Sequence, residues 1–245
     1  MILELDVGNT RAKWRRPGDS NVRVDGGSVE LEAIREAIPW QDPPAESVKV
    51  ASVAGERFEA ELSEFLQRCI GLVPRFARAA AQAGRIRSGY HVTTQLGVDR
   101  WLAMLAAGEI TSEAFGVLDG GSAITLDLVA SSGDHLGGYI TPGLAAMRDS
   151  LRHGTARVSP GVTTRRIPVG PRRSTRDGVN AGILRMVGDF AVMEFSRLVS
   201  VHGADAVLFV TGGDGETLSR LCADEGIEAR FVPELVLDGL ALACP

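Results

Sequence analysis

The sequence has little of what marks exported or membrane-bound proteins. Its three cysteines, Cys69, Cys222 and Cys244, are an odd number without a Cys-x-x-Cys pair. They predict reduced and mostly buried thiols rather than a disulfide framework. Acidic Glu4 and Asp6 come early, without a basic leader, and no segment approaches the roughly 20 apolar residues that cross a bilayer. We therefore expect a cytoplasmic protein with no membrane partner.

Basic charge and aromatic side chains are scarce as well. The net charge is -5 and aromatic residues make up 5% of the chain, whereas a general nucleic-acid binder needs a basic face that displaces counterions from phosphates. The main irregular basic segment, residues 165–176, contains no aromatic side chain on which a base would stack. The sequence predicts an exposed loop there and no nucleic-acid partner. A narrower role in an anionic substrate site or a subunit contact stays open for this loop.

The spacing of zinc sites and of serine hydrolases is also missing. His91, His135, His153 and His202 have no cysteine or acid at short paired spacing, so we expect surface histidines rather than a zinc centre. Ser122 lacks the Gly-x-Ser-x-Gly context of a nucleophile elbow. A zinc enzyme and a serine hydrolase are therefore disfavoured.

What the chain contains fits a folded, loop-rich α/β protein. Hydrophobic residues make up 44% of the 245 residues, charged residues 23%, and there are 29 glycines. The length suits one large domain or two small ones. Apolar patterns predict strands at 2–7, 48–53, 115–118, 124–129, 136–140 and 206–210, and helices at 56–70, 101–107, 177–201 and 216–225. We expect two lobes, residues 1–114 and 115–245.

Two short acidic-glycine segments, residues 5–10 and 118–123, each follow an apolar run. In each, an aspartate at a strand end is followed two residues later by glycine, which permits a tight hairpin whose backbone N–H groups approach a phosphate. One such segment is weak evidence for a phosphate site, because aspartate and glycine are ordinary turn formers. Two copies at matching places predict an internal duplication, with two loops facing each other across a cleft that holds a nucleotide and its metal.

Two further segments point to chemistry. Residues 206–225 are predicted to form a strand, a glycine turn and a helix, an arrangement whose helix N-terminus and bare backbone contact nucleotides. Before the helix at 101–107, polar and aromatic residues gather around Asp99 and Arg100. Asp99 is either a plain helix N-terminal acid or a carboxylate that accepts a proton from a substrate hydroxyl, with Arg100 holding an anionic group.

Taken in order, these segments resemble the type III pantothenate kinase family along nearly the whole chain. The matching segments are residues 6–10, 13–15, 97–100, 119–123, 137–143, 211–214 and 238–243. The resemblance implies an actin-, hexokinase- and Hsp70-like architecture of two ribonuclease-H-like lobes with the nucleotide bound between them. It also implies a homodimer that phosphorylates pantothenate with ATP to 4'-phosphopantothenate, the first step of coenzyme A biosynthesis.

The resemblance also implies a role for each matching residue. Asp6 would hold Mg²⁺ through water, Asp119 would bind a monovalent cation, K⁺ or NH₄⁺, and Asp99 would be the general base. The residues implied for ATP and its phosphates are Gly8, Asn9, Thr10, Lys13, Gly121, Ser122, Ala123, Gly212 and Gly213. Those implied for pantothenate are Tyr90, Gly97, Asp99, Arg100 and, from the partner subunit, Thr175. Ser122 replaces the family's threonine; its hydroxyl is kept, so we expect phosphate binding to persist.

Two rival functions stand beside this prediction. A sugar or acetate kinase of the same superfamily would keep the paired phosphate loops but would lack the set of Tyr90, residues 97–100 and Thr175. Some proteins that resemble the family are accessory regulators of transcription, in which catalysis is absent or secondary. The intact Asp6, Asp99 and Asp119 argue against a loss of catalysis.

Overall fold

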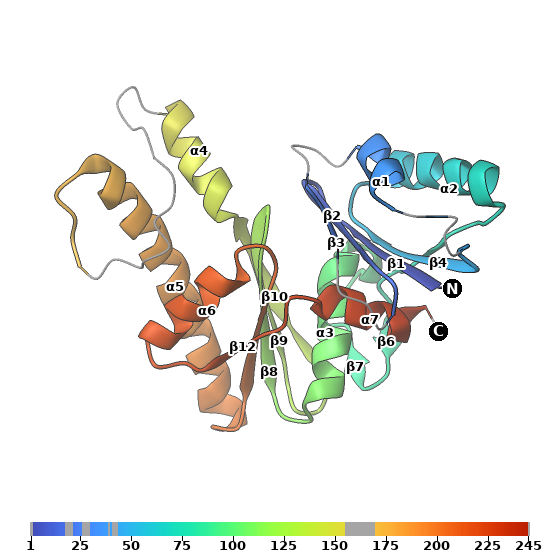
Figure 1. The fold of residues 1–245 in the computed structure, drawn as a ribbon. Coiled ribbons are helices and arrows are strands. Elements are labelled where there is room, and N and C mark those ends of the chain that lie inside the picture. Colours follow the sequence, from blue (N-terminus) through green and yellow to red (C-terminus); the bar gives the residue numbers. More distant parts are fainter. Residues whose placement is uncertain are drawn as a thin grey trace. The chain divides into compact units, whose positions relative to one another are not determined.

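The chain divides into two compact units, each built around its own sheet. The computed structural model describes residues 2–17, 22–25, 30–38, 40, 44–154 and 170–244. One unit contains Met1–Ala106 with Leu235–Pro245, and the other contains Ala107–Glu234 (Figure 1). This division differs from a single boundary near residue 115, because the last helix groups with the N-terminal unit, where it packs on strands of that unit's sheet.

The first unit is built on a five-stranded sheet. Its strands are β1 (Ile2–Val7), β2 (Arg11–Arg15), β3 (Val22–Asp25), β4 (Ser47–Ser52) and β5 (Arg75–Phe76), in the order β3-β2-β1-β4-β5. The first three strands are antiparallel neighbours, and β4 and β5 run parallel to β1. A tight hairpin joins β1 to β2, whereas parallel pairing requires the longer connections through helices.

Helices and a small hairpin complete the first unit. They are α1 (Leu31–Ala37), α2 (Glu56–Ile70), the 3-10 helix η1 (Thr93–Gln95), α3 (Val98–Ile110), α7 (Leu235–Ala243) and the strands β6 (Gln82–Ala83) and β7 (Ile86–Arg87). Helix α3 crosses the division, since its residues from Ala107 on belong to the other unit. Helix α2 spans the residues that its helical periodicity predicts, and its buried Phe58, Leu62 and Leu66 pack on Leu3, Leu5 and Val50 of the sheet. Cys69 on this helix is exposed, so the expectation of buried thiols is wrong for it.

The second unit repeats the same sheet. Its strands are β8 (Phe115–Gly120), β9 (Ala123–Val129), β10 (His135–Pro142), β11 (Val207–Thr211) and β12 (Ala229–Phe231), in the order β10-β9-β8-β11-β12. Strands β8, β9 and β10 are antiparallel, while β11 and β12 run parallel to β8. Strand order and directions therefore match those of the first sheet, which confirms the internal duplication.

Three helices pack on one face of the second sheet. They are α4 (Leu144–Gly154), α5 (Thr175–His202) and α6 (Gly215–Asp224), and they share a core with Leu118, Leu126 and Val210 (Figure 1). Within the predicted basic loop, Thr175 already begins α5, because Ser174 caps that helix; residues 165–169 lie outside the described residues. Among the described residues, no helix combines the length and apolar character needed to span a membrane.

One histidine departs from the expected surface placement. His135 on β10 is 3% exposed, and its Nε2 lies 2.9 Å from Oδ1 of the equally buried Asp127 on β9. The hairpin carries this pair into the interior, where each polar group satisfies the other. The pair has the role of a buried polar contact within the sheet, and no group of three or more metal-ligating side chains gathers among the described residues.

Candidate phosphate and substrate sites

The first predicted phosphate loop is the tip of the β1–β2 hairpin. Asp6 is the next-to-last residue of β1 and is paired in register with Lys13 on β2 and with Ala51 on β4. The backbone N–H of Gly8 donates to the carbonyl of Arg11 at 2.9 Å and closes the turn, which leaves Asn9 and Thr10 exposed at the tip. This turn presents backbone groups to solvent, as phosphate binding requires.

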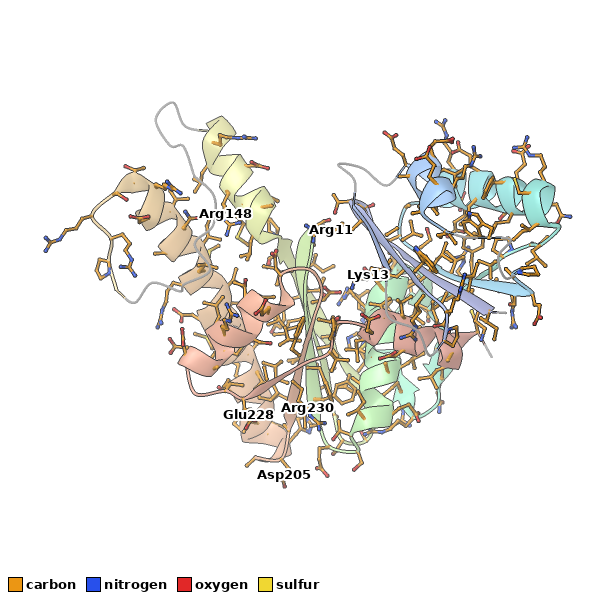
Figure 2. All side chains as sticks on the ribbon, viewed as in Figure 1. Arg11, Lys13, Arg148, Asp205, Glu228 and Arg230 are labelled. Atoms are coloured by element: carbon orange, nitrogen blue, oxygen red, sulfur yellow. The ribbon has the colours of Figure 1, made fainter. Side chains whose placement is uncertain are left out.

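Strand β2 adds positive charge behind this tip. Its exposed or half-buried Arg11, Lys13 and Arg15 alternate with buried Ala12 and Trp14, so the three basic side chains share one face. Figure 2 labels Arg11 and Lys13, which both come from this strand. The hairpin thus joins an exposed tip to a basic face that attracts anions.

The basic face also anchors the C-terminal helix. Arg15 Nε lies 2.7 Å from Glu4 Oε2, and its Nη1 lies 2.6 Å from Asp238 Oδ1 on α7. Burial lowers the pKa of Arg15, but the hydrogen bonds with Asp238 and Glu4 and their charges outweigh it and raise that pKa. Segments 13–15 and 238–243 both resemble the family and lie far apart in the sequence. The Arg15–Asp238 ion pair brings them into contact.

The second predicted phosphate loop is the tip of the β8–β9 hairpin. Asp119 is the next-to-last residue of β8, and the N–H of Gly121 donates to the carbonyl of Ala123 at 2.9 Å. Gly121 and Ser122 are exposed. The N–H of Gly143, just before α4, donates to the Ser122 carbonyl at 3.1 Å. A side chain at Gly143 would collide with the loop backbone, so this buried glycine fixes the loop from behind.

The glycine turn after β11 packs on the same loop. Gly212 has a φ of 86°, and a Cβ there would collide with the Asp119 carboxylate and the Gly120 carbonyl. The N–H of Asp214 donates to that carbonyl at 2.9 Å, and α6 begins at the next residue. The structure therefore brings together Asp119, the second loop, the Gly212–Gly213 turn and the N-terminus of α6, a place that favours anions.

The predicted substrate residues of the first unit form a separate cluster at the start of α3. Arg100 is 5% exposed; its Nη1 donates to the Tyr90 hydroxyl at 2.8 Å, and its guanidinium lies 5.5 Å from the Tyr90 ring centre. Asp99 lies in the first turn of α3, and its Oδ1 accepts from the Arg100 N–H at 2.8 Å. A side chain at Gly97 would collide with that same oxygen. The cluster joins one carboxylate, one guanidinium and one phenol.

Thr175 belongs to the second unit. It is the exposed first residue of α5, and the preceding Ser174 Oγ accepts from the Asp177 N–H at 3.2 Å as the helix cap. The structure thus has the threonine followed by a helix that the sequence predicts. Its contact with substrate stays a prediction.

The carboxylate of Asp6 suits Mg²⁺ held by few protein ligands. Mg²⁺ usually keeps several waters and binds one or two carboxylates together with substrate phosphates. Within the described residues there is no cage of three or more acidic, histidine or cysteine side chains, and each hairpin offers one aspartate beside exposed loop backbone. The chemistry of these residues therefore fits a metal that arrives with a nucleotide.

Sequence reasoning missed several residues of the second site. Gly143 lies in a matching segment but was not assigned a role, although its contact with Ser122 fixes the loop. Thr125 and Thr211 flank Asp119 in the sheet. The alternation of β9 predicts which face Thr125 lies on, but the sequence contains no signal for its pairing with Asp119.

One cavity in the second unit is unrelated to the predicted residues. It has a volume of about 480 Å³ and lies between α5 and α6, lined by Leu184, Arg185, Gly188, Leu221 and Glu225 among others. None of the predicted site residues lines it. Arg185, on its rim, is paired with Asp189 and Glu225, which accounts for its charge.

Comparison with solved structures identifies the fold. A Campylobacter jejuni protein assigned to the Baf family of transcriptional activators has a TM-score of 0.62 at 22% identity, over 98% of this chain and 95% of that one. The ADPNP-bound activator of 2-hydroxyisocaproyl-CoA dehydratase from Clostridium difficile has 0.51 at 13% identity, over 99% and 92%. An archaeal actin homologue has 0.50 at 14% identity, over 98% and 97%. These likenesses show the actin-like fold alone.

Sequence comparison is more specific. The type III pantothenate kinase from Pseudomonas paraeruginosa (strain DSM 24068 / PA7) is 39% identical over 251 residues, covering 100% of this chain and 99% of that protein. The enzyme of the same name from Pseudomonas aeruginosa (strain LESB58) is 37% identical over 250 residues, with the same coverage. The model of a family described as type III pantothenate kinase matches residues 2–194. With relatives matched from end to end, the chain belongs to the type III pantothenate kinase family.

Proposed function

We propose that this chain is a transferase that moves the γ-phosphoryl group of ATP to the hydroxyl of pantothenate and forms 4'-phosphopantothenate, the first step of coenzyme A biosynthesis. The family match over residues 2–194 carries the proposal. The two hairpin tips and the Asp99–Arg100–Tyr90 cluster support it, because they supply phosphate-binding backbone and an acid–base group.

The phosphate chain is assigned to the two hairpin tips. Gly8, Asn9, Thr10 and Lys13 contact it from the first unit, and Gly121, Ser122 and Ala123 from the second. The Gly212–Gly213 turn borders the adenosine. Asp6 holds Mg²⁺, in part through water, and the bound ion neutralises phosphate charge. Phosphoryl transfer has a loose transition state with charge spread over phosphate oxygens, so alignment and electrostatics supply most of the catalysis.

Asp99 is assigned as the general base. It orients the substrate hydroxyl and accepts its proton late, as the new oxygen–phosphorus bond forms, because a carboxylate is a weak base toward an alcohol. Arg100 and Tyr90 bind pantothenate, and their mutual hydrogen bond fixes both side chains before substrate arrives. Gly97 leaves space for the Asp99 carboxylate.

A homodimer is part of the proposal. Strand β10 is the edge of its sheet and exposes Leu136, Tyr139 and Ile140. Tyr139 packs on Phe190 of α5 and donates to Glu194 at 2.8 Å, and exposed Met186 and Met193 continue along the helix. We assign this apolar surface to a second copy, because an unpaired edge strand beside exposed apolar side chains is a ready surface for association.

The dimer assignment is testable by light scattering during gel filtration. Met193→Asp, on the same stripe of α5 as Phe190, is expected to shift the wild-type dimer toward monomer, since it buries a charge at the contact. Val73→Asp, at a 69% exposed loop position of the first unit, is the matched control and keeps the wild-type mass. A Met193→Asp protein of unchanged mass would assign the contact elsewhere.

Thr175 is assigned to the substrate of the partner subunit. Mixing Asp99→Asn protein with Thr175→Ala protein tests this directly. If the threonine acts across the dimer, half of the dimers are mixed and each has one intact site, so about a quarter of wild-type turnover returns. If it acts within its own subunit, every site keeps one defect and mixing restores nothing.

The activity itself is tested by ADP release from purified protein with ATP, Mg²⁺ and pantothenate, first with K⁺ and then with Na⁺ only. We expect turnover that requires pantothenate and rises with K⁺. A folded protein that binds ATP and releases no ADP with pantothenate would contradict the proposal. The cytoplasmic location and the lack of nucleic-acid and membrane partners stay predictions.

A further inference from the structure

The two sheets place equivalent aspartates beside different neighbours. In the first sheet, the row through Asp6 reads Lys13, Asp6, Ala51 across β2, β1 and β4. In the second, the row through Asp119 reads Thr125, Asp119, Thr211 across β9, β8 and β11. Residues paired in register project to the same face of a sheet. Lys13 and Thr125 therefore hold equivalent positions, one basic and the other a neutral hydroxyl.

We propose that Thr125 and Thr211 complete the monovalent-cation site at Asp119, and that the bound ion supplies there the charge that the Lys13 ammonium supplies beside Asp6. The inference rests on the proposed function, since the cation is implied by the family. It adds two residues to the site. It also gives a reason for the ion: one unit of the duplicated fold carries the Lys13 side chain as its cation, and the other binds an exchangeable ion at the equivalent position.

The donor set fits such an ion. Carboxylate and hydroxyl oxygens are hard ligands suited to K⁺ and, as hydrogen-bond acceptors, to NH₄⁺. Thr211 is 1% exposed and Thr125 is half-buried, so the site is shielded on one side and open on the other. The positive φ of Gly212 brings backbone against the Asp119 carboxylate and limits its movement.

The charge count favours a monovalent ion. The row contributes one carboxylate and two neutral hydroxyls, a donor set whose single negative charge one monovalent ion balances.

The duplication itself supplies the decisive variant, Thr125→Lys. It transfers the basic residue of the first sheet to the equivalent position of the second, in an antiparallel pair of the same register. Because Thr125 is half-buried, the lysine stem lies along the sheet with its ammonium near Asp119. Ala223→Lys adds the same charge at an exposed position near the end of α6 and is the matched control.

Two readouts are used: turnover across a titration of K⁺ against Na⁺, and the midpoint of thermal unfolding in ADP and Mg²⁺ across the same titration. Wild-type and Ala223→Lys proteins should turn over faster and melt higher in K⁺ than in Na⁺. Thr125→Lys should retain turnover in Na⁺ and lose the K⁺-specific rise in melting temperature. Thr125→Val and Thr211→Val should need about tenfold more K⁺ for the same rise, because each loses one oxygen that contacts a charge.

Each outcome decides the inference. A folded Thr125→Lys protein with the wild-type K⁺ response in both readouts overturns it, as do valine variants with unchanged K⁺ midpoints. The valine variants keep the test valid if the lysine variant does not fold. A wild type that fails to phosphorylate pantothenate but melts higher in K⁺ than in Na⁺, with the expected response of the valine variants, would sink the proposed function and support this site.

Discussion

Asp6 and Asp119 occupy the same place in two sheets of one topology, the next-to-last residue of the first strand. Around Asp6 the structure gathers a basic strand face, and around Asp119 it gathers two threonines, a glycine turn and a helix N-terminus. The duplicated backbone thus repeats the loop that suits phosphate, and the side chains beside it set the charge. A shared fold is consistent with different ionic requirements in its two halves.

The two units also differ in what lies beyond the hairpin. In the first, the cluster of Tyr90, Asp99 and Arg100 carries the groups that we assign to the acceptor substrate. In the second, the corresponding chemistry is backbone: Gly143 and the Gly212 turn fix the loop by close approach. We therefore expect substitutions in the first unit to act mainly on turnover, and those at the glycines of the second to act on stability and cation dependence.

The largest effect is expected at a residue without a counterpart in the second unit. Asp99→Asn should lower turnover by about 10²–10⁴-fold, the usual contribution of a positioned acid–base group. The amide preserves shape and hydrogen bonding at the start of α3, so circular dichroism and melting temperature should be unchanged. Steady-state ADP release measures the effect. Turnover close to that of the wild type would remove the base assignment.

Substitutions of Asp6 and Asp119 test most directly whether the two units bind different ions. Asp6→Asn should reduce turnover about 10²–10³-fold, as expected for a lost electrostatic contact in a phosphoryl-transfer site, and should raise the Mg²⁺ concentration needed for half-maximal rate. Asp119→Asn should instead remove the stimulation by K⁺. Titrations of both ions with both variants separate the two roles. Identical ion profiles would mean that the two aspartates act alike.

A smaller effect is expected from the glycine turn. Gly212→Ala places a side chain at a φ of 86° and against the Asp119 carboxylate, and such strain costs of order 1–3 kcal/mol. Gly8→Ala in the first hairpin creates only one tight contact, at 3.2 Å from the Arg11 carbonyl, so it should destabilise the protein less. Urea unfolding of both variants gives the difference. Equal losses, or a larger loss at Gly8, would reverse this ranking.

The smallest effects concern the thiols. Burial raises the pKa of Cys222 to about 11 from 9.0, so the unfolded chain ionises first. Its contribution to stability is therefore complete below about pH 9 and is lost as the pH rises toward 11. At pH 8, a thiol reagent should modify exposed Cys69 quickly and buried Cys222 and Cys244 only after unfolding in urea. Cys69→Ser should abolish the fast phase of thiol modification in the folded protein. A fast phase that survives in this variant would show that a buried thiol is accessible.

Local patterns predicted the elements well. Helix α2 has the bounds that its apolar spacing predicts, and both Asp-x-Gly segments form hairpins, because such elements depend on residues close in sequence. The burial of Cys69 and the surface placement of His135 were wrong. In both, the neighbours that decide burial come from other elements, which a single periodic pattern does not contain.

The sequence by itself determined the two Asp-x-Gly hairpins, the amphipathic helix and, through its ordered segments, the family. These features rest on short-range geometry and on residue types at fixed spacing. Only the tertiary structure decided that Arg15 meets Asp238, that Gly143 supports Ser122, and that Thr125 and Thr211 flank Asp119. Such contacts join strands and helices distant in the chain, and their register is set by packing of whole faces rather than by any one segment.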